Sequence, residues 1–262
     1  MVYRRASQPF CYCAGGLVLA SNIDLDGLVK VGNTDADFHF TFETGEPPHP
    51  HSCVLRWPGR YGLELHRLNA EWLMTSRFGA AFQVSGDGRQ IVGFCVGGQP
   101  TAVFNDILVR RVLPRVATLR GRIALHASAV GKHGRALVLL GPSKAGKSTI
   151  AAALALRHSW DILSDDICVL DFGSKVTVAP MGTGVCLWPD SQKALDFPAD
   201  SCRAMPAYPG KIHFEGFTAD SIHVTARRQS AKSNYGSVRP LRRQCRAITC
   251  PIRKATPPWH PW

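Results

Sequence analysis

A single nine-residue segment restricts the folds open to this chain more than any other feature of the sequence. Residues 141–149 are GPSKAGKST and satisfy the pattern G-x-x-x-x-G-K-[ST]. The apolar run 135–140 before it is typical of a buried strand, and residues 148–156, which include three consecutive alanines, favour a helix. Residues 161–164 then predict a further short strand. This order of strand, loop, helix and strand is the context in which the pattern binds phosphate, so the sequence predicts an α/β core.

The residue types in this segment suit a triphosphate. Gly141 and Gly146 allow the backbone to curl, so that several N–H groups point at phosphate oxygens. The helix that follows directs its positive end to the same place. Lys147 is expected to reach the β- and γ-phosphates, and the Ser148 hydroxyl is expected to ligate Mg²⁺; an ordinary tight turn before a helix is the alternative. The residues expected to bind ATP are Gly141, Pro142, Ser143, Lys144, Ala145, Gly146, Lys147, Ser148 and Thr149.

Three further polar residues are candidates for chemistry. Asp165 and Asp166 follow the predicted strand 161–164. In proteins with this loop, an Asp at the end of a neighbouring strand helps to hold Mg²⁺, and a second carboxylate can accept the proton of an attacking hydroxyl. Adjacent residues of an extended chain point to opposite sides, so the two need not share a role; a solvated turn or a helix N-cap is the alternative. His126, on the predicted strand 123–130, is by itself better interpreted as a hydrogen-bonded structural residue than as a catalytic one.

Together these segments resemble the HPr kinase/phosphorylase family, and most closely its stand-alone members found beside peptide-maturation systems, including lasso-peptide kinases. The resemblance rests on residues 125–130 (LHASAV), on GPSKAGKST and on residues 163–166 (LSDD). It implies a P-loop core of the HPr kinase type and an ATP-dependent kinase that phosphorylates a Ser hydroxyl of a small protein or peptide. It also implies that Asp166 accepts the proton, that His126 and Lys147 contribute to catalysis, and that Asp165 supports either the metal site with Ser148 or the geometry of the loop.

The chain departs from that family at two positions of the loop. Lys144 stands where relatives usually have Gly, and Thr149 stands where they have an acidic residue. A downstream signature on which their phosphorylase activity depends is also missing, so the resemblance implies kinase chemistry without the reverse reaction. Arg203 and Lys211 lie where relatives place basic residues near the transferred phosphate.

The hydrophobic pattern changes near residue 120 and divides the chain into two parts. Residues 1–120 are expected to form a β-rich N-terminal lobe, and residues 121–226 the kinase core. Apolar positions between 103 and 116 share one helical face, with Pro114 expected to kink or end the helix. Alternating or apolar runs predict strands in the N-terminal lobe: 38–42, 78–84 and 91–96.

The net charge of +12 is concentrated at the C-terminal end. Residues 227–262 hold nine Lys or Arg and no acidic residue, whereas residues 1–226 hold 22 basic and 19 acidic residues. Because this segment also lacks apolar periodicity, we expect a basic, disordered tail. A basic tail can bind nucleic acid or another acidic surface, but a solvated appendage is favoured and a nucleic-acid partner is not expected.

The cellular location and the oligomeric state of the protein are predicted from weaker signals in the sequence. No apolar run approaches the ~20 residues that span a bilayer, so no membrane association is expected. Residues 10–20 follow two arginines, as in a secretory signal, but their Cys and Gly residues weaken the apolar run and a first β-strand is favoured. Nine cysteines without a C-x-x-C pair give little support to a structural zinc site and suit a reducing compartment. We therefore expect a cytoplasmic protein and leave open whether it forms a homo-oligomer.

The sequence thus favours an Mg²⁺- and ATP-dependent kinase that acts on a Ser-bearing protein or peptide. Two alternatives use the same loop. One is a nucleotide-binding module without turnover, motivated by Lys144 and the unusual tail; the other is a kinase of a small metabolite, which differs only in the acceptor. Every residue expected to contact phosphate lies between His126 and Lys211, so the tail is predicted to be dispensable for nucleotide binding.

Overall fold

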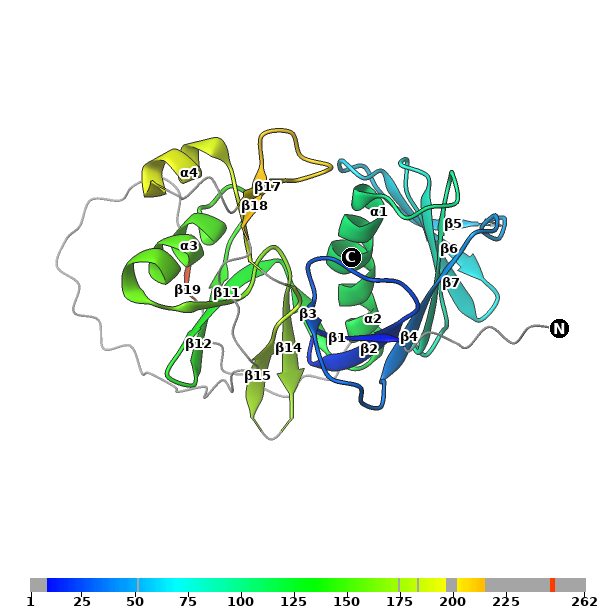
Figure 1. The fold of residues 1–262 in the computed structure, drawn as a ribbon, viewed down its shortest axis with the longest axis horizontal. Helices are drawn as coiled ribbons and strands as arrows, with labels where there is room; N and C mark the ends of the chain where they lie inside the picture. Colours follow the sequence, from blue (N-terminus) through cyan, green and yellow to red (C-terminus); the bar gives the residue numbers. More distant parts are fainter. Residues whose placement is uncertain are drawn as a thin grey trace.

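The structure is a computed structural model that describes residues 9–50, 52–173, 175–182, 184–196 and 202–214, and the backbone of residues 246 and 247. Among these residues strands outnumber helices, and the strands form four separate sheets. This composition confirms the predicted mixed α/β class. In Figure 1 the largest sheet lies at one end of the molecule and helix α3 (Lys147–His158) lies toward the other. No helix within the described ranges is long and apolar enough to cross a membrane.

The largest sheet has nine strands and contains most of the described residues before position 96. Its strands are β1 (Phe10–Ala14), β2 (Leu17–Ser21), β3 (Val29–Lys30), β4 (Phe38–Glu43), β5 (Cys53–Trp57), β6 (Leu63–Leu68), β7 (Glu71–Thr75), β8 (Ala80–Val84) and β9 (Gln90–Cys95). They lie in the order β3-β1-β2-β4-β9-β8-β7-β6-β5, and β4 runs parallel to both of its neighbours. The strands predicted in the N-terminal lobe are present as β4, β8 and β9. The single strand expected over residues 10–20 is instead a hairpin, because Gly15 and Gly16 both adopt positive φ angles that turn the chain back.

A continuous helical segment covers one face of this sheet (Figure 1). It consists of α1 (Ala102–Ile107), a π-helical turn η1 (Leu108–Val112) and α2 (Leu113–Leu119). Pro114 does not end the helix, since the segment continues to Leu119, but it directly follows a π turn, which is one of the features at which helices kink. Pro114 falls in the first turn of α2, directly after the π turn has replaced the usual hydrogen-bond pattern, so its missing N–H costs little.

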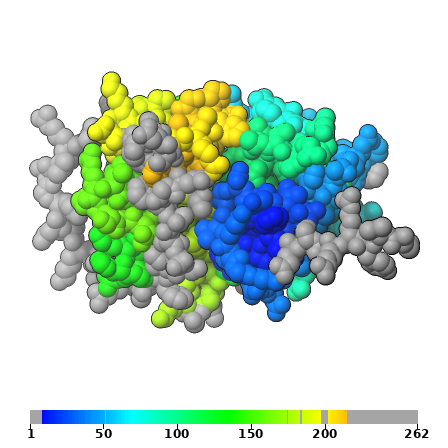
Figure 2. Space-filling view, viewed as in Figure 1, coloured from blue at the N-terminus to red at the C-terminus, as the bar shows by residue number. Residues whose placement is uncertain are grey.

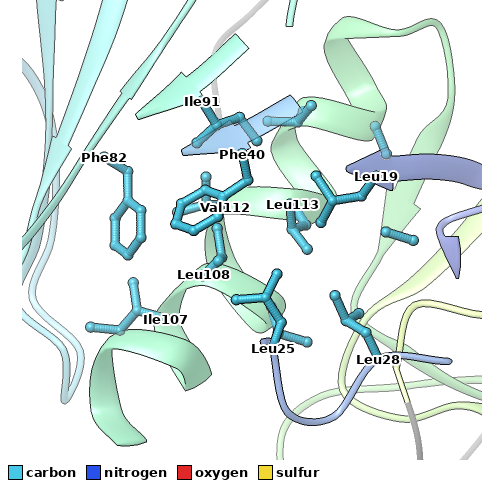
Figure 3. Close-up of a cluster of buried hydrophobic side chains, with 14 of the residues drawn as sticks. Leu19, Leu25, Leu28, Phe40, Phe82, Ile91, Ile107, Leu108, Val112 and Leu113 are labelled. Atoms are coloured by element: carbon cyan, nitrogen blue, oxygen red, sulfur yellow. The ribbon is translucent and has the colours of Figure 1, made fainter. Parts of the chain in front are cut away.

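The main hydrophobic core lies between the helical segment and the sheet. Figure 3 shows Phe40 and Phe82 from the strands beside Ile107 from the helices. The same cluster also includes buried side chains from beyond residue 120, among them Val169 and Met181. Residues from both halves of the described chain therefore share one core, which fixes the later residues relative to the large sheet.

The second half of the chain is built around α3. Its sheet has the order β13-β11-β12-β19, with β11 (Ala127–Lys132), β12 (Arg135–Leu140), β13 (Asp161–Ser164) and β19 (Arg246–Ala247). Strand β12, helix α3 and strand β13 are the elements predicted around the glycine-rich loop. Ala151, Ala152 and Ala155 of α3 are buried in the cluster that the helix forms with this sheet, and their small side chains allow the helix to lie close to it.

The strand predicted over residues 123–130 is two strands rather than one. β10 (Ile123–Leu125) joins β14 (Cys168–Phe172) and β15 (Val176–Ala179) in a separate sheet, whereas β11 pairs with β12 and β13. His126 occupies the break between β10 and β11 and pairs in neither ladder. The change of sheet thus leaves the His126 side chain free to turn toward the loop that precedes α3.

The remaining elements flank α3. Strands β16 (Val185–Leu187), β18 (Ile212–Phe214) and β17 (Cys202–Ala204) form the fourth sheet, and α4 (Pro189–Leu195) lies beside α3. Figure 2 shows the surface of the β17–β18 region meeting that of the helical segment. Within the predicted tail 227–262 the structure describes only the backbone of β19, which pairs with the end of β12; the rest of the tail lies outside the described residues.

Candidate active site around the glycine-rich loop

The loop between β12 and α3 borders a pocket of about 730 Å³. Its walls come from the loop and the first turn of α3, from His126 and Asp166, and from residues 186–191 with Lys211. A pocket of this size is typical of small-molecule sites. Residues that lie far apart in the sequence therefore enclose one space directly in front of the helix N-terminus.

The backbone of the loop adopts conformations that favour glycine. Gly146, the N-cap of α3, has a φ of 92°, and Lys144 has a φ of 65°. Gly146 has no side chain that could cap the first turn of α3, and that turn lines the pocket. The unsatisfied N–H groups and the dipole of the helix give this end of the pocket a positive potential. A left-handed conformation at Lys144 also gives a physical reason why glycine would suit that position.

Lys147 lies folded onto the loop. It is only 6% exposed, and its amine donates hydrogen bonds to the carbonyl oxygens of Gly141 and Pro142, both at 3.0 Å. The amine also lies 3.3 Å from Nε2 of His126. Because an ammonium group can only donate, the consistent assignment is that Nε2 of His126 accepts and Nδ1 carries the ring proton.

Asp165 ties the end of β13 to the start of α3. Its carboxylate accepts hydrogen bonds from the Ser128 hydroxyl at 2.5 Å, the Ser148 hydroxyl at 2.8 Å and the Cys186 backbone N–H at 2.9 Å. Asp165 is buried, and Ser128 has no exposed surface. The arrangement places a carboxylate oxygen directly beside the hydroxyl that opens the helix.

Asp166 faces a different set of partners. Nδ1 of His126 lies 2.8 Å from its backbone oxygen and 3.3 Å from its carboxylate, and the Arg111 guanidinium lies 3.2 Å from the other carboxylate oxygen. Burial by itself would raise the pKa of Asp166, but the hydrogen bond from His126 and three nearby cations outweigh it, so the pKa lies well below its ordinary value. The three cations are Arg111, Arg110 and Lys211. The hydrogen bond to Asp166 is in turn the largest of the effects that raise the pKa of His126.

The backbone explains why the two adjacent carboxylates diverge. Asp166 has a φ of 71°, which Asp tolerates better than most residues but which still costs conformational energy. Asp165 lines a smaller cavity of about 180 Å³ on the side of the helical segment, whereas Asp166 lines the larger pocket beside the loop. The two side chains diverge because Asp166 has a left-handed backbone, rather than through the strand alternation expected from the sequence.

The structure brings most of the predicted site residues to one place. Six of the nine loop residues line the pocket directly: Ser143, Lys144, Gly146, Lys147, Ser148 and Thr149. Gly141 and Pro142 instead hold the Lys147 amine, and Ala145 donates its N–H to the Pro142 oxygen at 3.2 Å. His126, Asp166 and Lys211 line the same pocket. Arg203 lies elsewhere, at the smaller cavity and 3.6 Å from Asp26.

Four contributors were missed by sequence reasoning. Arg111 lies within the predicted amphipathic helix, where a charged residue suggests only a solvated face, yet the π turn directs it to Asp166. Ser128 and the Cys186 N–H hold Asp165 from strands whose proximity depends on the fold. Trp188 lies at the pocket wall, with the Lys211 amine 5.8 Å from its ring centroid.

Comparisons of the chain with protein-family models, with curated proteins and with solved structures give no match. The function is therefore inferred from the residues of the pocket and their geometry.

Proposed function

We propose that the protein is an Mg²⁺-dependent kinase that transfers the γ-phosphoryl group of ATP to a Ser hydroxyl of a small protein or peptide. The observation that carries this proposal is the position of the Ser148–Asp165 pair and the Lys147 amine next to a pocket that Asp166 also lines. These are the parts that phosphoryl transfer requires: an anion-binding helix end, a cation for the phosphates, a metal site and an acceptor-orienting carboxylate.

The residues present suit the cofactors. A triphosphate entering the pocket meets the N-terminus of α3 and the cationic side chains of Lys144, Lys147 and Lys211. Lys147 would exchange its two carbonyl contacts for phosphate oxygens. The Ser148 hydroxyl and the Asp165 carboxylate are both oxygen ligands, which Mg²⁺ prefers, and when bound the ion would neutralise charge on the phosphates.

The transfer step involves one bond made and one broken. The acceptor oxygen attacks the γ-phosphorus while the bond from that phosphorus to the β,γ-bridging oxygen breaks, and ADP leaves. The Ser proton passes to the Asp166 carboxylate. Because its partners hold the pKa of Asp166 low, this carboxylate acts mainly by orienting the hydroxyl, which is what a loose transition state requires. His126 fixes the carboxylate from one side and contacts Lys147 from the other.

The test is transfer of label from γ-labelled ATP to Ser-containing peptides in the presence of Mg²⁺. Lys147→Ala and Asp166→Asn should each reduce the rate about a hundredfold or more. Lys175→Ala, an exposed lysine on the hairpin of β14 and β15, is the matched control and should leave the rate unchanged. Transfer that survives both site substitutions would contradict the proposal.

One observation favours a second function, nucleotide-dependent binding without turnover. Asp166 is engaged by both His126 and Arg111, which makes it a weak base in this arrangement. Calorimetric titration with Mg·ATP beside the transfer assay separates the two functions. Tight binding that Lys147→Ala abolishes, without transfer to any acceptor, would favour the binding module.

A further inference from the structure

Three side chains with metal-ligating atoms meet at the edge of the nine-stranded sheet. The Cys53 sulfur, a Glu64 carboxylate oxygen and a His66 ring nitrogen all lie within 4.8 Å of one another. The strand pairing explains this proximity, because Cys53 on β5 pairs directly with His66 on β6. Glu64 precedes His66 by two residues and so points to the same face of the sheet. Cys53, Glu64 and His66 thus form one cluster, although nothing in the sequence relates them.

This cluster lies apart from the proposed kinase site. Leu63 and Leu65, which alternate with Glu64 and His66 along β6, pack into the core beneath the helical segment. The cluster is therefore on the opposite face of the sheet, turned away from the helices. In Figure 1, strands β5 and β6 lie at the far end of the molecule from α3.

The sheet holds the histidine in place before any ion binds. His66 is 5% exposed, and its Nε2 lies 3.2 Å from the Thr75 hydroxyl and 3.5 Å from Glu64. Its Nδ1 has no hydrogen-bond partner among the described residues. The ring atom that faces Glu64 and Thr75 is Nε2, so Nε2 is the atom that would bind an ion in place of its contact with the Thr75 hydroxyl.

A cationic side chain already occupies the cluster. Nε of Arg56 lies 3.4 Å from the Cys53 sulfur and 3.3 Å from the Glu64 carboxylate. The Arg56 side chain is 72% exposed, so it can move into water at little cost when another cation takes its place. The position between Cys53 and Glu64 is therefore one at which the fold stabilises positive charge.

The geometry points to a binding site for Zn²⁺, with Cys53, Glu64 and His66 as ligands and water in the fourth position. Sulfur and imidazole ligands select Zn²⁺ over Mg²⁺ or Ca²⁺, and one carboxylate completes a ligand set of the kind that zinc accepts. Ligand atoms around tetrahedral zinc lie about 3.3–3.7 Å apart. The Glu64–His66 spacing of 3.5 Å already meets this condition. Cys53 is exposed on an edge strand and needs to move by at most about 1.5 Å.

The test uses the full-length chain, free of nucleotide and kept reduced. Titration with Zn²⁺ in a calorimeter should show one site that Cys53→Ser and Glu64→Gln each weaken at least about tenfold, or 1.4 kcal/mol. His39→Asn, which removes an exposed histidine on β4 of the same sheet, is the matched control and should bind as the unchanged chain does. Arg56→Gln should bind more tightly, because it removes the competing cation.

Cobalt provides a second readout that does not depend on kinase activity. Co²⁺ in the site should give a thiolate-to-metal charge-transfer absorption, and Cys53→Ser should abolish it. Affinity should also fall at lower pH, since the thiol must lose its proton to bind the metal. Zinc binding that is the same in Cys53→Ser and Glu64→Gln as in the unchanged chain would overturn the inference, as would a Co²⁺ complex without the thiolate band.

Discussion

Replacing Asp165 by alanine should lower the free energy of unfolding by about 3–4 kcal/mol. The carboxylate accepts hydrogen bonds from the Ser128 hydroxyl and the Cys186 N–H, and both residues are buried. A buried donor left without a partner costs about 1–3 kcal/mol, so two of them account for the expected loss. The third donor, Ser148, is only partly buried, so its hydroxyl can turn to water and adds little.

The matched substitution Asp165→Asn keeps the shape of the side chain and should cost less than about 1.5 kcal/mol. A serine hydroxyl can accept as well as donate. The amide can therefore turn its oxygen to the Cys186 N–H and its NH₂ group to Ser128 and Ser148. Both substitutions remove the negative charge beside Ser148, so both should weaken Mg·ATP binding to a similar extent.

Urea unfolding without nucleotide measures the first effect, and calorimetric titration with Mg·ATP measures the second. Equal unfolding midpoints for the alanine and asparagine variants would refute the hydrogen-bond reasoning. Unchanged Mg·ATP affinity in the asparagine variant would refute the metal role of Asp165, while leaving the stability reasoning intact.

Four further predictions each rest on one local feature: an ion pair, a backbone angle, a raised pKa and a strand pairing. Arg111→Met should raise the pKa of Asp166 by removing a cation, so the acidic limb of the kcat/KM profile should move to higher pH; an unmoved limb would count against the ion pair. Lys144→Gly should stabilise the fold by about 0.5–1 kcal/mol in urea because it relieves a left-handed φ, whereas Ser143→Gly, at a position without positive φ, should not. The raised pKa of His126 should make its stabilisation complete below about pH 6.5 and lost as the pH rises through the folded-state pKa, so unfolding of His126→Asn should differ most from the unchanged chain at low pH. Truncation after residue 226 should change ATP affinity less than about tenfold in a binding titration, and a larger loss would assign β19 a role in the site.

The elements around the loop could be predicted because their patterns are local. A pattern of about ten residues or fewer is enough to recognise each of three features: the apolar run of β12, the glycine-rich loop and the alanine-rich start of α3. The structure has them where they are predicted. In the N-terminal lobe, local patterns of the same kind predicted β4, β8 and β9. What the pattern does not contain is which strands pair, so the nine-stranded sheet, with β4 parallel to both of its neighbours, could not be derived.

In the site, too, the sequence pattern does not reveal contacts that depend on strand pairing: the change of sheet at His126 and the hydrogen bonds to Asp165 are two examples. An apolar run from 123 to 130 gives no sign that the chain changes sheets at its fourth residue. Ser128 and Cys186 are ordinary strand residues by sequence, and they reach Asp165 only because β11 and β16 lie on either side of it. The sequence pattern gives no sign of the π turn before Pro114, so the continuation of the helix to Leu119 could not be predicted.

The π turn also connects the two halves of the chain through the proposed base. It is the element that carries Arg110 and Arg111, and π turns of this kind are frequent at functional sites. Arg111 extends from it to Asp166, while Arg110 is held by Asp106 at 2.8 Å from the preceding turn. The helical segment is at the same time packed in the core that it shares with the nine-stranded sheet. The Arg111–Asp166 pair therefore joins the carboxylate proposed to meet the acceptor hydroxyl to the helical segment that packs against the nine-stranded sheet.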